Sequence, residues 1–430
     1  MKHRLRALFC DHLSVMRGKY LPGHKIGDGS TRFCLSVFGT HYDRDLLLDA
    51  PHARVREGLP DMELHWRGDD IRDSWDAATK IVLGDLHDTD GSPLPLCPRG
   101  ALKRAVAGWQ AMGLTPKVGI ELEAYALQAD DRGNLVPYDA PGGVVYGTGP
   151  FADPLRFNDR IWEMADTLGF RLDLITSEFD TPQFEYTLAF DDAVKAVDDI
   201  VLFRLMAREI ALEYGIVLSF MPKPVATGGG SGMHVNFSFL DGDGGNALSA
   251  GPLGGPDHLN DLARGCLAGL VHHHKGLAGL VAPTANSYLR LQPGSLSGHW
   301  KNWGGDHRNV TTRVSSEGGA KARLEHRMAD ASANPYTAVA AVLQAARLGV
   351  DNGYALPPME TGDGFDRTDT REGTALDLKG AVADLERDTA LVQAVGPELV
   401  ENHVFMKRKE VRKTRDLEGE ALRDFYVYFL

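Results

Sequence analysis

The chain has 430 residues, of which 43% are hydrophobic and 24% charged, a composition typical of globular proteins. Its net charge of −13 argues against a nucleic-acid or anionic-membrane partner, because such surfaces repel an acidic protein. No apolar stretch approaches the roughly 18 residues of a membrane-spanning helix. The cysteines are scattered, without a C-x-x-C pair, so we expect a reduced, cytoplasmic protein: Cys10, Cys34, Cys97 and Cys266.

The length predicts two domains, because one hydrophobic core rarely serves more than about 300 residues. Residues 4–100 alternate short apolar runs with turn residues, and the Asp-Gly at 90–91 is typical of a turn between extended segments. We therefore predict a small, mostly β domain over residues 1–97 and a second domain over residues 98–430.

The strand-like sequence VGIELEAY, at 118–125, carries two glutamates in an otherwise apolar run. Side chains two positions apart leave the same face of a strand, so Glu121 and Glu123 point into one small volume. Like charges held that close repel each other, and a divalent cation is the expected compensation. The alternative is an edge strand whose solvated face carries both glutamates, since E-x-E is a common pattern.

Two further carboxylates lie in the extended segment RLDLITSEFDTPQFEYTLAF, at 171–190. Glu178 and Glu185 are an odd number of positions apart, which alone places them on opposite faces of one strand. Thr181-Pro182 interrupts the run, so a turn or hairpin can bring both carboxylates to one place.

A glycine cluster, Gly228 to Gly230 followed by Gly232, precedes the alternating sequence VNFSF. Glycine permits positive φ and a close backbone approach to a ligand, although a flexible loop is the simpler alternative. His234 then stands at the start of a strand. A single histidine is more often structural, but here four carboxylates already require partners.

Arginines dominate the segments that follow. On a strand, Arg323, Glu325 and Arg327 share a face, so a carboxylate sits between two guanidinium groups. A cross-strand ladder of ion pairs is one alternative. The interpretation we favour is that five arginines, with the carboxylates and the histidine, hold metal-bound phosphates and a substrate carboxylate: Arg290, Arg308, Arg313, Arg323 and Arg327.

Apolar periodicity predicts several helices in the second domain, over residues 101–112, 158–168, 193–214, 261–281 and 338–350. The consecutive histidines 272–274 fan around the fourth of these helices and cannot share a metal well, so we interpret them as structural or surface residues. Residues 356–375 are polar and rich in glycine and proline, which predicts a surface loop.

Together these segments resemble the glutamine synthetase family. The resemblance runs from MRGKYLP and LCPRGALK through VGIELEAY, SEFDTPQFEY, FMPKP, GGGSGMHVNFS and NSYLRL to RLEHRMADASANPY. It implies an α+β fold, with an N-terminal β-grasp domain and a C-terminal catalytic domain whose antiparallel sheet is framed by helices. It also implies a homo-oligomeric double ring, a dodecamer in our prediction, with active sites between subunits.

The same resemblance implies a role for each candidate residue. Glu123, Glu178 and Glu185 match the ligands of one Mg²⁺ or Mn²⁺ ion, and Glu121, His234 and Glu325 those of a second. ATP would contact Asp173, Ser238, Arg308, Arg313 and Arg323. The amino-acid substrate would contact Gly230, Arg290 and Arg327, and the expected catalytic residues are Arg308, Glu325 and Arg327.

Departures from the family pattern bear on the second substrate. Leu296 stands where ammonia-using members carry a glutamate on a flap, and Leu289 replaces the lysine of the preceding motif. Gly229 and Asn236 replace an asparagine and a histidine, and Asp43 or Asp45 lies in the region of the aspartate that binds ammonium. A leucine makes the amine pocket less polar.

The predicted activity is therefore an ATP-dependent ligase that joins the γ-carboxylate of glutamate to an organic amine through γ-glutamyl phosphate. The alternatives are an ammonia-dependent glutamine synthetase and a catalytically silent, ring-forming relative. An acid other than glutamate is a further alternative, since Arg290 and Arg327 favour an α-carboxylate but say little about chain length.

Overall fold

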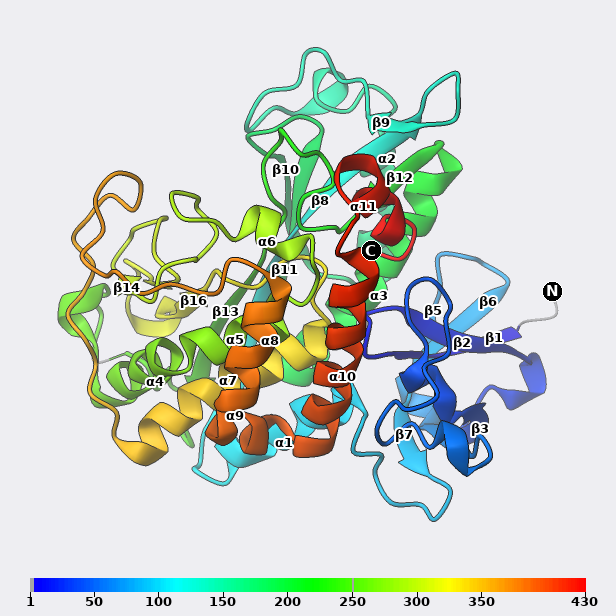
Figure 1. Ribbon diagram of the computed structural model, residues 1–430, viewed down its shortest axis with the longest axis horizontal. Helices are drawn as coiled ribbons and strands as arrows, with labels where there is room; N and C mark the ends of the chain where they lie inside the picture. The colour runs from blue at the N-terminus through cyan, green and yellow to red at the C-terminus, as the bar shows by residue number, and fades with distance from the viewer. Residues whose placement is uncertain (1–3, 250) are drawn as a thin grey trace.

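A computed structural model describes residues 4–249 and 251–430 and has an α+β fold (Figure 1). A small β domain is formed by the N-terminal strands, and the rest of the chain forms a large catalytic sheet with helices. The expected fold class is confirmed. All four cysteines are free, and no described helix is long and apolar enough to cross a membrane.

Two small sheets form the N-terminal part. The first has the strand order β2-β1-β6-β5, and β1 runs parallel to β6. The second has the order β3-β4-β7. Their bounds are β1 Arg4–Cys10, β2 Met16–Pro22, β3 Gly29–Cys34, β4 Asp61–Trp66, β5 Arg72–Asp73, β6 Thr79–Leu83 and β7 Asp85–Asp88. Helix α1 (Pro98–Gln110) begins after the connection 89–97, with Cys97 as its N-cap. The domain division between residues 97 and 98 stays a prediction.

The catalytic sheet has nine strands in the order β10-β11-β8-β13-β16-β15-β14, with β12 and β9 also paired to β8. All pairs are antiparallel except β14 with β15. The bounds are β8 Thr115–Ala129, β9 Leu135–Pro137, β10 Leu172–Ser177, β11 Gln183–Asp192, β12 Ile216–Ser219, β13 Met233–Leu240, β14 Trp303–Gly304, β15 Thr312–Val314 and β16 Leu324–His326.

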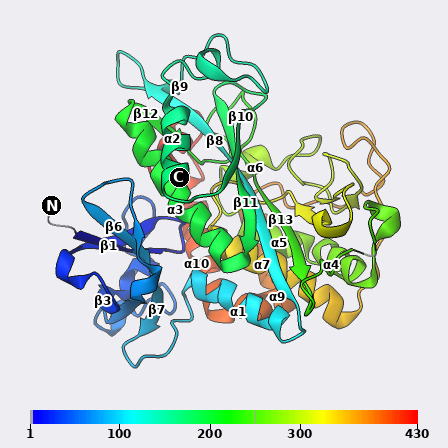
Figure 2. The same cartoon turned by 180° about the vertical axis from the view of Figure 1, so that it is seen from behind.

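Strand β8 is the centre of this sheet. Its side chains alternate between the face that packs on the hydrophobic core and the face that carries the glutamates. Val118, Ile120 and Leu122 are at most 2% exposed and belong to the main hydrophobic core. Glu121 and Glu123 leave the opposite face. Helices α1 and α3 (Ala193–Glu213) contact β8 (Figure 2). The Trp109 ring of α1 packs 4.1 Å from that of Phe239.

The remaining helices are α2 Phe157–Thr167, α4 Asp261–His272, α5 His274–Val281, α6 Ser287–Arg290, α7 Pro335–Asn352, α8 Leu378–Arg387, α9 Thr389–Val395, α10 Pro397–Thr414 and α11 Gly419–Tyr426. The helices predicted over 101–112, 158–168, 193–214 and 338–350 are present. The single helix predicted over 261–281 is wrong, because the chain breaks at His273 between α4 and α5. His273 Nδ1 lies 2.8 Å from Oδ2 of Asp388, and His274 Nε2 donates to the carbonyl of His299.

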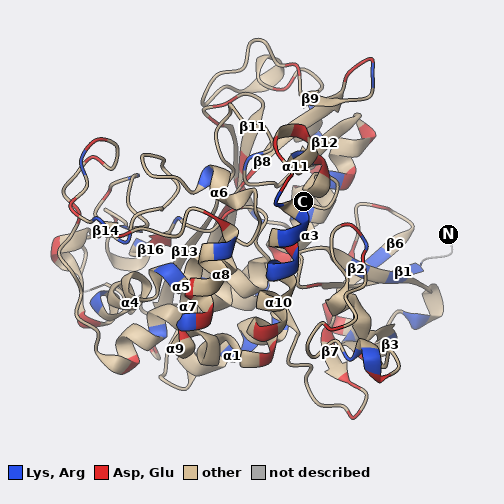
Figure 3. Cartoon of the chain, viewed as in Figure 1, with Lys and Arg blue, Asp and Glu red and all other residues tan. Residues whose placement is uncertain are grey.

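Basic residues concentrate in the second half of α10, in the sequence KRKEVRK (Figure 3). Two of these lysines are already engaged. Lys407 pairs with Glu410 at 2.8 Å in the interior, and Lys413 reaches Asp43 and Asp45 at 2.5 and 2.8 Å. The two aspartates expected near the amine site therefore tie α10 to the N-terminal part within this chain.

Candidate active site

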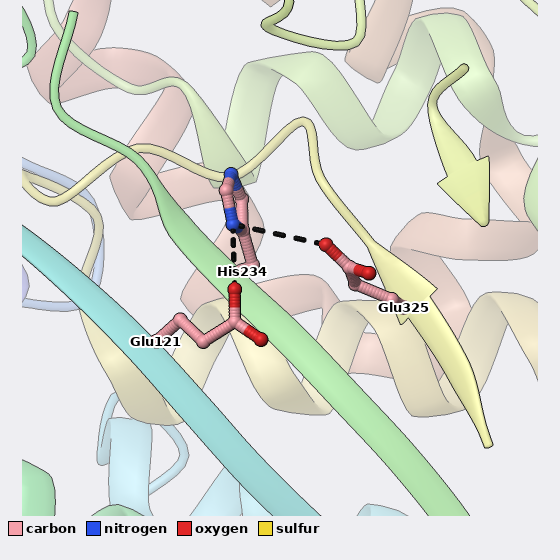
Figure 4. Close-up of side chains that lie close together, drawn as sticks. All are labelled: Glu121, His234 and Glu325. Carbon is pink, nitrogen blue, oxygen red and sulfur yellow. Dashed lines mark hydrogen bonds and ion pairs between the residues drawn. The ribbon is translucent and has the colours of Figure 1, made fainter. Parts of the chain in front are cut away.

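Three ligand-type side chains from adjacent strands converge on one face of the catalytic sheet (Figure 4). Glu121 on β8, His234 on β13 and Glu325 on β16 each offer an atom, and these atoms lie within 4.8 Å of one another. His234 Nδ1 lies 3.1 Å from Oε2 of Glu121 and 3.8 Å from Oε1 of Glu325. Two carboxylates and an imidazole at this spacing form a candidate site for a divalent cation.

The register of the sheet explains why these residues meet. Residues directly opposite each other in antiparallel strands project from the same face. His234 lies opposite Glu121, and Asn236 lies opposite Glu325. Asn236 Nδ2 also donates to Oε1 of Glu121 at 3.0 Å. Burial raises the pKa of Glu121, but the hydrogen bonds from His234 and Asn236 outweigh it and lower that pKa to about 2.

A second group of carboxylates lies next to the first. Glu185 on β11 is directly opposite Glu123, and the hairpin between β10 and β11 brings Glu178 into the same group. Burial raises the pKa of Glu185 to about 8, and so do the charges of Glu121, Glu123 and Glu178. Burial and the Glu123 charge also raise the pKa of Glu178. These raised pKa values show crowded negative charge at this position, which suits a divalent cation.

The second group is wider than the first. Among the residues that the structure describes, only Glu121, His234 and Glu325 meet the compact spacing, so the ligand atoms of Glu123, Glu178 and Glu185 lie further apart. Glu123 is nevertheless fixed, because Gly232 N donates to its Oε2 at 2.8 Å and Gln183 Nε2 at 3.2 Å. The five carboxylates and one histidine fit one or two Mg²⁺ or Mn²⁺ ions, which prefer oxygen ligands.

The glycine segment packs directly on Arg290. A Cβ on Gly230 would lie 2.4 Å from Cγ of Arg290, and a Cβ on Gly232 would lie 2.8 Å from its guanidinium. Only glycine permits this approach. The buried Arg290 donates to the carbonyls of Met328 and Arg327 at 2.9 and 3.2 Å. The backbone of 230–232 and the arginine therefore form one unit beside the carboxylates.

Two arginines hold Glu325, but they are not the pair that alternation on one strand suggested. Arg327 pairs with Oε1, and Arg313 NH1 donates to Oε2 at 3.1 Å. Arg323, just before β16, instead donates to Glu317 at 2.6 Å. The expectation that Glu325 sits between Arg323 and Arg327 is therefore wrong.

Three predicted ATP contacts lie further out. Asp173 is exposed on the edge strand β10, and Ser238 lies on β13 two positions after Asn236, on the same face. Arg308 is exposed in the segment between β14 and β15. Their roles stay predictions.

Sequence reasoning missed two residues at the site. Gln183 bonds both Glu123 and the carbonyl of Gly230, the latter at 3.0 Å, and Asp306 pairs with Arg313. Gln183 could have been found from its place between Thr181-Pro182 and Glu185. Nothing in the spacing of Asp306 distinguishes it from a surface aspartate.

Comparison with known proteins agrees with this geometry. The sequence model "Glutamine synthetase, catalytic domain" matches residues 95–425. The chain belongs to the glutamine synthetase family.

Three relatives illustrate the range of this family. A glutamine synthetase of Halobacterium salinarum is 28% identical over 98% of this chain and 93% of its own length. A glutamate–isopropylamine ligase of a Pseudomonas species is 29% identical, covering 79% of this chain and 75% of its own. A structure of GmaS in complex with ADP superposes with a TM-score of 0.82 at 25% identity, over 99% of this chain and 97% of that one. As a glutamine synthetase-family ligase, the protein is an ATP-dependent glutamate ligase.

Proposed function

We propose that this ligase joins the γ-carboxylate of L-glutamate to an organic amine rather than to ammonia. The observation that carries the proposal is Leu296, six residues after Arg290 in the loop that follows α6. Its side chain is 44% exposed, so it can line a substrate pocket, and it places an apolar group where ammonia-using members of the family carry a carboxylate. The similarity to a glutamate–isopropylamine ligase supports the same substrate class.

The proposed roles follow the position of each residue. Glu121, His234 and Glu325 would hold one Mg²⁺ or Mn²⁺ ion, and Glu123, Glu178 and Glu185 a second. Arg290, with Gly230 and Arg327, would bind the α-carboxylate of glutamate. Arg308, Arg313, Arg323, Asp173 and Ser238 would bind ATP, whose phosphates suit guanidinium groups.

The chemistry needs two transfers. A γ-carboxylate oxygen of glutamate attacks the terminal phosphorus of ATP, and the bond to the ADP oxygen breaks. The amine nitrogen then attacks the acyl carbon of γ-glutamyl phosphate, phosphate leaves with the bonding electrons, and the nitrogen loses a proton. Bound divalent cations and the arginines would neutralise charge on the phosphoryl group during the first transfer. Arg327 and Arg313 would also keep Glu325 oriented.

An amine panel tests this proposal. ADP release is measured with glutamate and each of ammonia, methylamine, isopropylamine, ethanolamine and a polyamine, and an organic amine is expected to give the highest kcat/KM. Leu296→Glu restores the carboxylate, so we expect the ratio of ammonia to amine kcat/KM to rise about tenfold, or about 1.4 kcal/mol. Leu212→Glu, at an exposed leucine of α3, is the control. Robust activity of the native chain with ammonia alone would overturn the proposal.

We also propose that the chain assembles as a dodecameric double ring with active sites between subunits. Four apolar side chains in the segment 144–151 and at the hairpin that carries Glu178 are 62–81% exposed, which supports a covering neighbour: Val144, Tyr146, Phe151 and Phe179. Twelve chains of 46.9 kDa give about 560 kDa in native mass spectrometry. A monomer at micromolar concentration would exclude the ring, and ten chains would revise its size.

A further inference from the structure

The segment that carries Arg308 and Arg313 has little regular structure of its own. It runs between the two-residue strand β14 and the three-residue strand β15. Arg308 is exposed, and the described residues provide no ion pair to hold it. Something else must fix its backbone if its side chain is to meet a phosphate reproducibly.

The loop 356–375 accepts hydrogen bonds from the side chains of both neighbours of Arg308. His307 Nε2 donates to the carbonyl of Gly362 at 2.6 Å, while its Nδ1 accepts from Asn309 N at 3.0 Å. These two bonds together require the neutral tautomer protonated at Nε2. The side chain of Asn309 also bonds the carbonyl of Asp363. The loop therefore holds both neighbours of Arg308.

Glu360 fixes the shape of that loop from within. Its carboxylate is only 4% exposed, yet it lies in a polar loop. Oε1 accepts from the backbone N–H groups of Gly362 and Asp369, each at 2.8 Å. Oε2 accepts from Nδ2 of Asn302 at 3.0 Å. Three donors on one buried carboxylate give bonds stronger than those between neutral groups.

Asn302 carries the connection towards the site. Its Oδ1 accepts from Thr311 N at 3.1 Å, and the carbonyl of Thr311 accepts from Arg327 N at 2.8 Å. Arg313 lies two residues beyond Thr311 on β15. Hydrogen bonds thus link the buried carboxylate of the loop, through Asn302, to the backbone of Thr311, which bonds Arg327 N and lies two residues before Arg313.

We propose that Glu360 is a positioning residue through which the loop 356–375 sets the placement of Arg308 and Arg313. It touches no substrate itself, and it acts on the affinity for ATP and on phosphoryl transfer. The inference rests on the proposed role of those arginines at the nucleotide phosphates.

The direction of the bonds makes Glu360→Gln a sharp test. The new amide oxygen must accept from Gly362 N and Asp369 N, so the amide nitrogen would face Nδ2 of Asn302, donor against donor. Rotating the Asn302 amide by 180° would instead set its Nδ2 against Thr311 N, which is again donor against donor. The variant keeps the volume and is expected to raise the dissociation constant of the Mn²⁺ complex of AMP-PNP about tenfold and to lower kcat, with KM for glutamate changed less than twofold.

Asn302→Asp should rescue that variant, because a carboxylate at position 302 accepts both from the amide nitrogen introduced at position 360 and from Thr311 N. Asn302→Asp alone places its carboxylate against that of Glu360, so this single variant is expected to bind the nucleotide more weakly. Rescue in the double variant would therefore require direct contact between positions 302 and 360. Asp366→Asn, an exposed carboxylate of the same loop, is the matched control, and circular dichroism checks that each variant is folded.

Calorimetry with AMP-PNP and Mn²⁺ needs no amine, so this measurement stands even if the proposed amine substrate is wrong. Nucleotide affinity within twofold of the native value in Glu360→Gln, or a double variant no better than the single variants, would overturn the role of Glu360. If Glu360→Gln does not fold, the double variant with Asn302→Asp decides the question. Failure of that double variant to bind AMP-PNP would overturn the role of Glu360.

Discussion

At the scale of single residues, Glu185 lies close to three other carboxylates. Its negative charge therefore destabilises the metal-free protein, and a bound cation would remove that repulsion. We expect Glu185→Gln to raise the thermal midpoint in EDTA by about 2 °C, because a like-charge repulsion is removed. The same change should weaken Mn²⁺ binding about tenfold, since a ligand is lost. Thermal scans in EDTA and across a Mn²⁺ titration measure both, and Glu163→Gln on the exposed face of α2 is the control. A lower midpoint in EDTA together with unchanged Mn²⁺ affinity would contradict the assignment.

At the scale of elements, helix periodicity located α1, α2, α3 and α7, because each buries apolar residues in the main hydrophobic core. It failed at residues 261–281, where both halves are apolar and periodicity has no signal for a break. At the break, His273 bonds Asp388, more than a hundred residues later. Alternation on β8 found Glu121 and Glu123, but alternation over 323–327 did not predict that Arg323 pairs with Glu317, a residue of the segment between β15 and β16.

At the scale of the molecule, α10 joins the two parts of the chain. Met406 is fully buried in the core of the N-terminal sheets, and Asn402 Nδ2 donates to the carbonyl of Phe38 at 3.1 Å. We expect Met406→Ala to lower the free energy of unfolding by about 3 kcal/mol, because it leaves a cavity between the two parts. Unfolding in urea should remain a single transition, with its midpoint at a lower urea concentration. Lys413→Ala, which removes a partly exposed ion pair, should cost less than about 1 kcal/mol. If the N-terminal part of Met406→Ala unfolded at a lower urea concentration than the rest of the chain, the two parts would unfold independently, contrary to this expectation.

The sequence by itself determined the family and the fold class and supplied the candidate site residues, because motifs and strand alternation are local properties of the chain. Only the tertiary structure decided which of them meet: strand register set His234 against Glu121, and a hairpin set Glu185 against Glu123. It also decided that Arg313, not Arg323, holds Glu325, and that Glu360 supports the segment of Arg308. Those contacts join residues far apart in the chain, and their geometry depends on where pairing starts and stops, which no local pattern encodes.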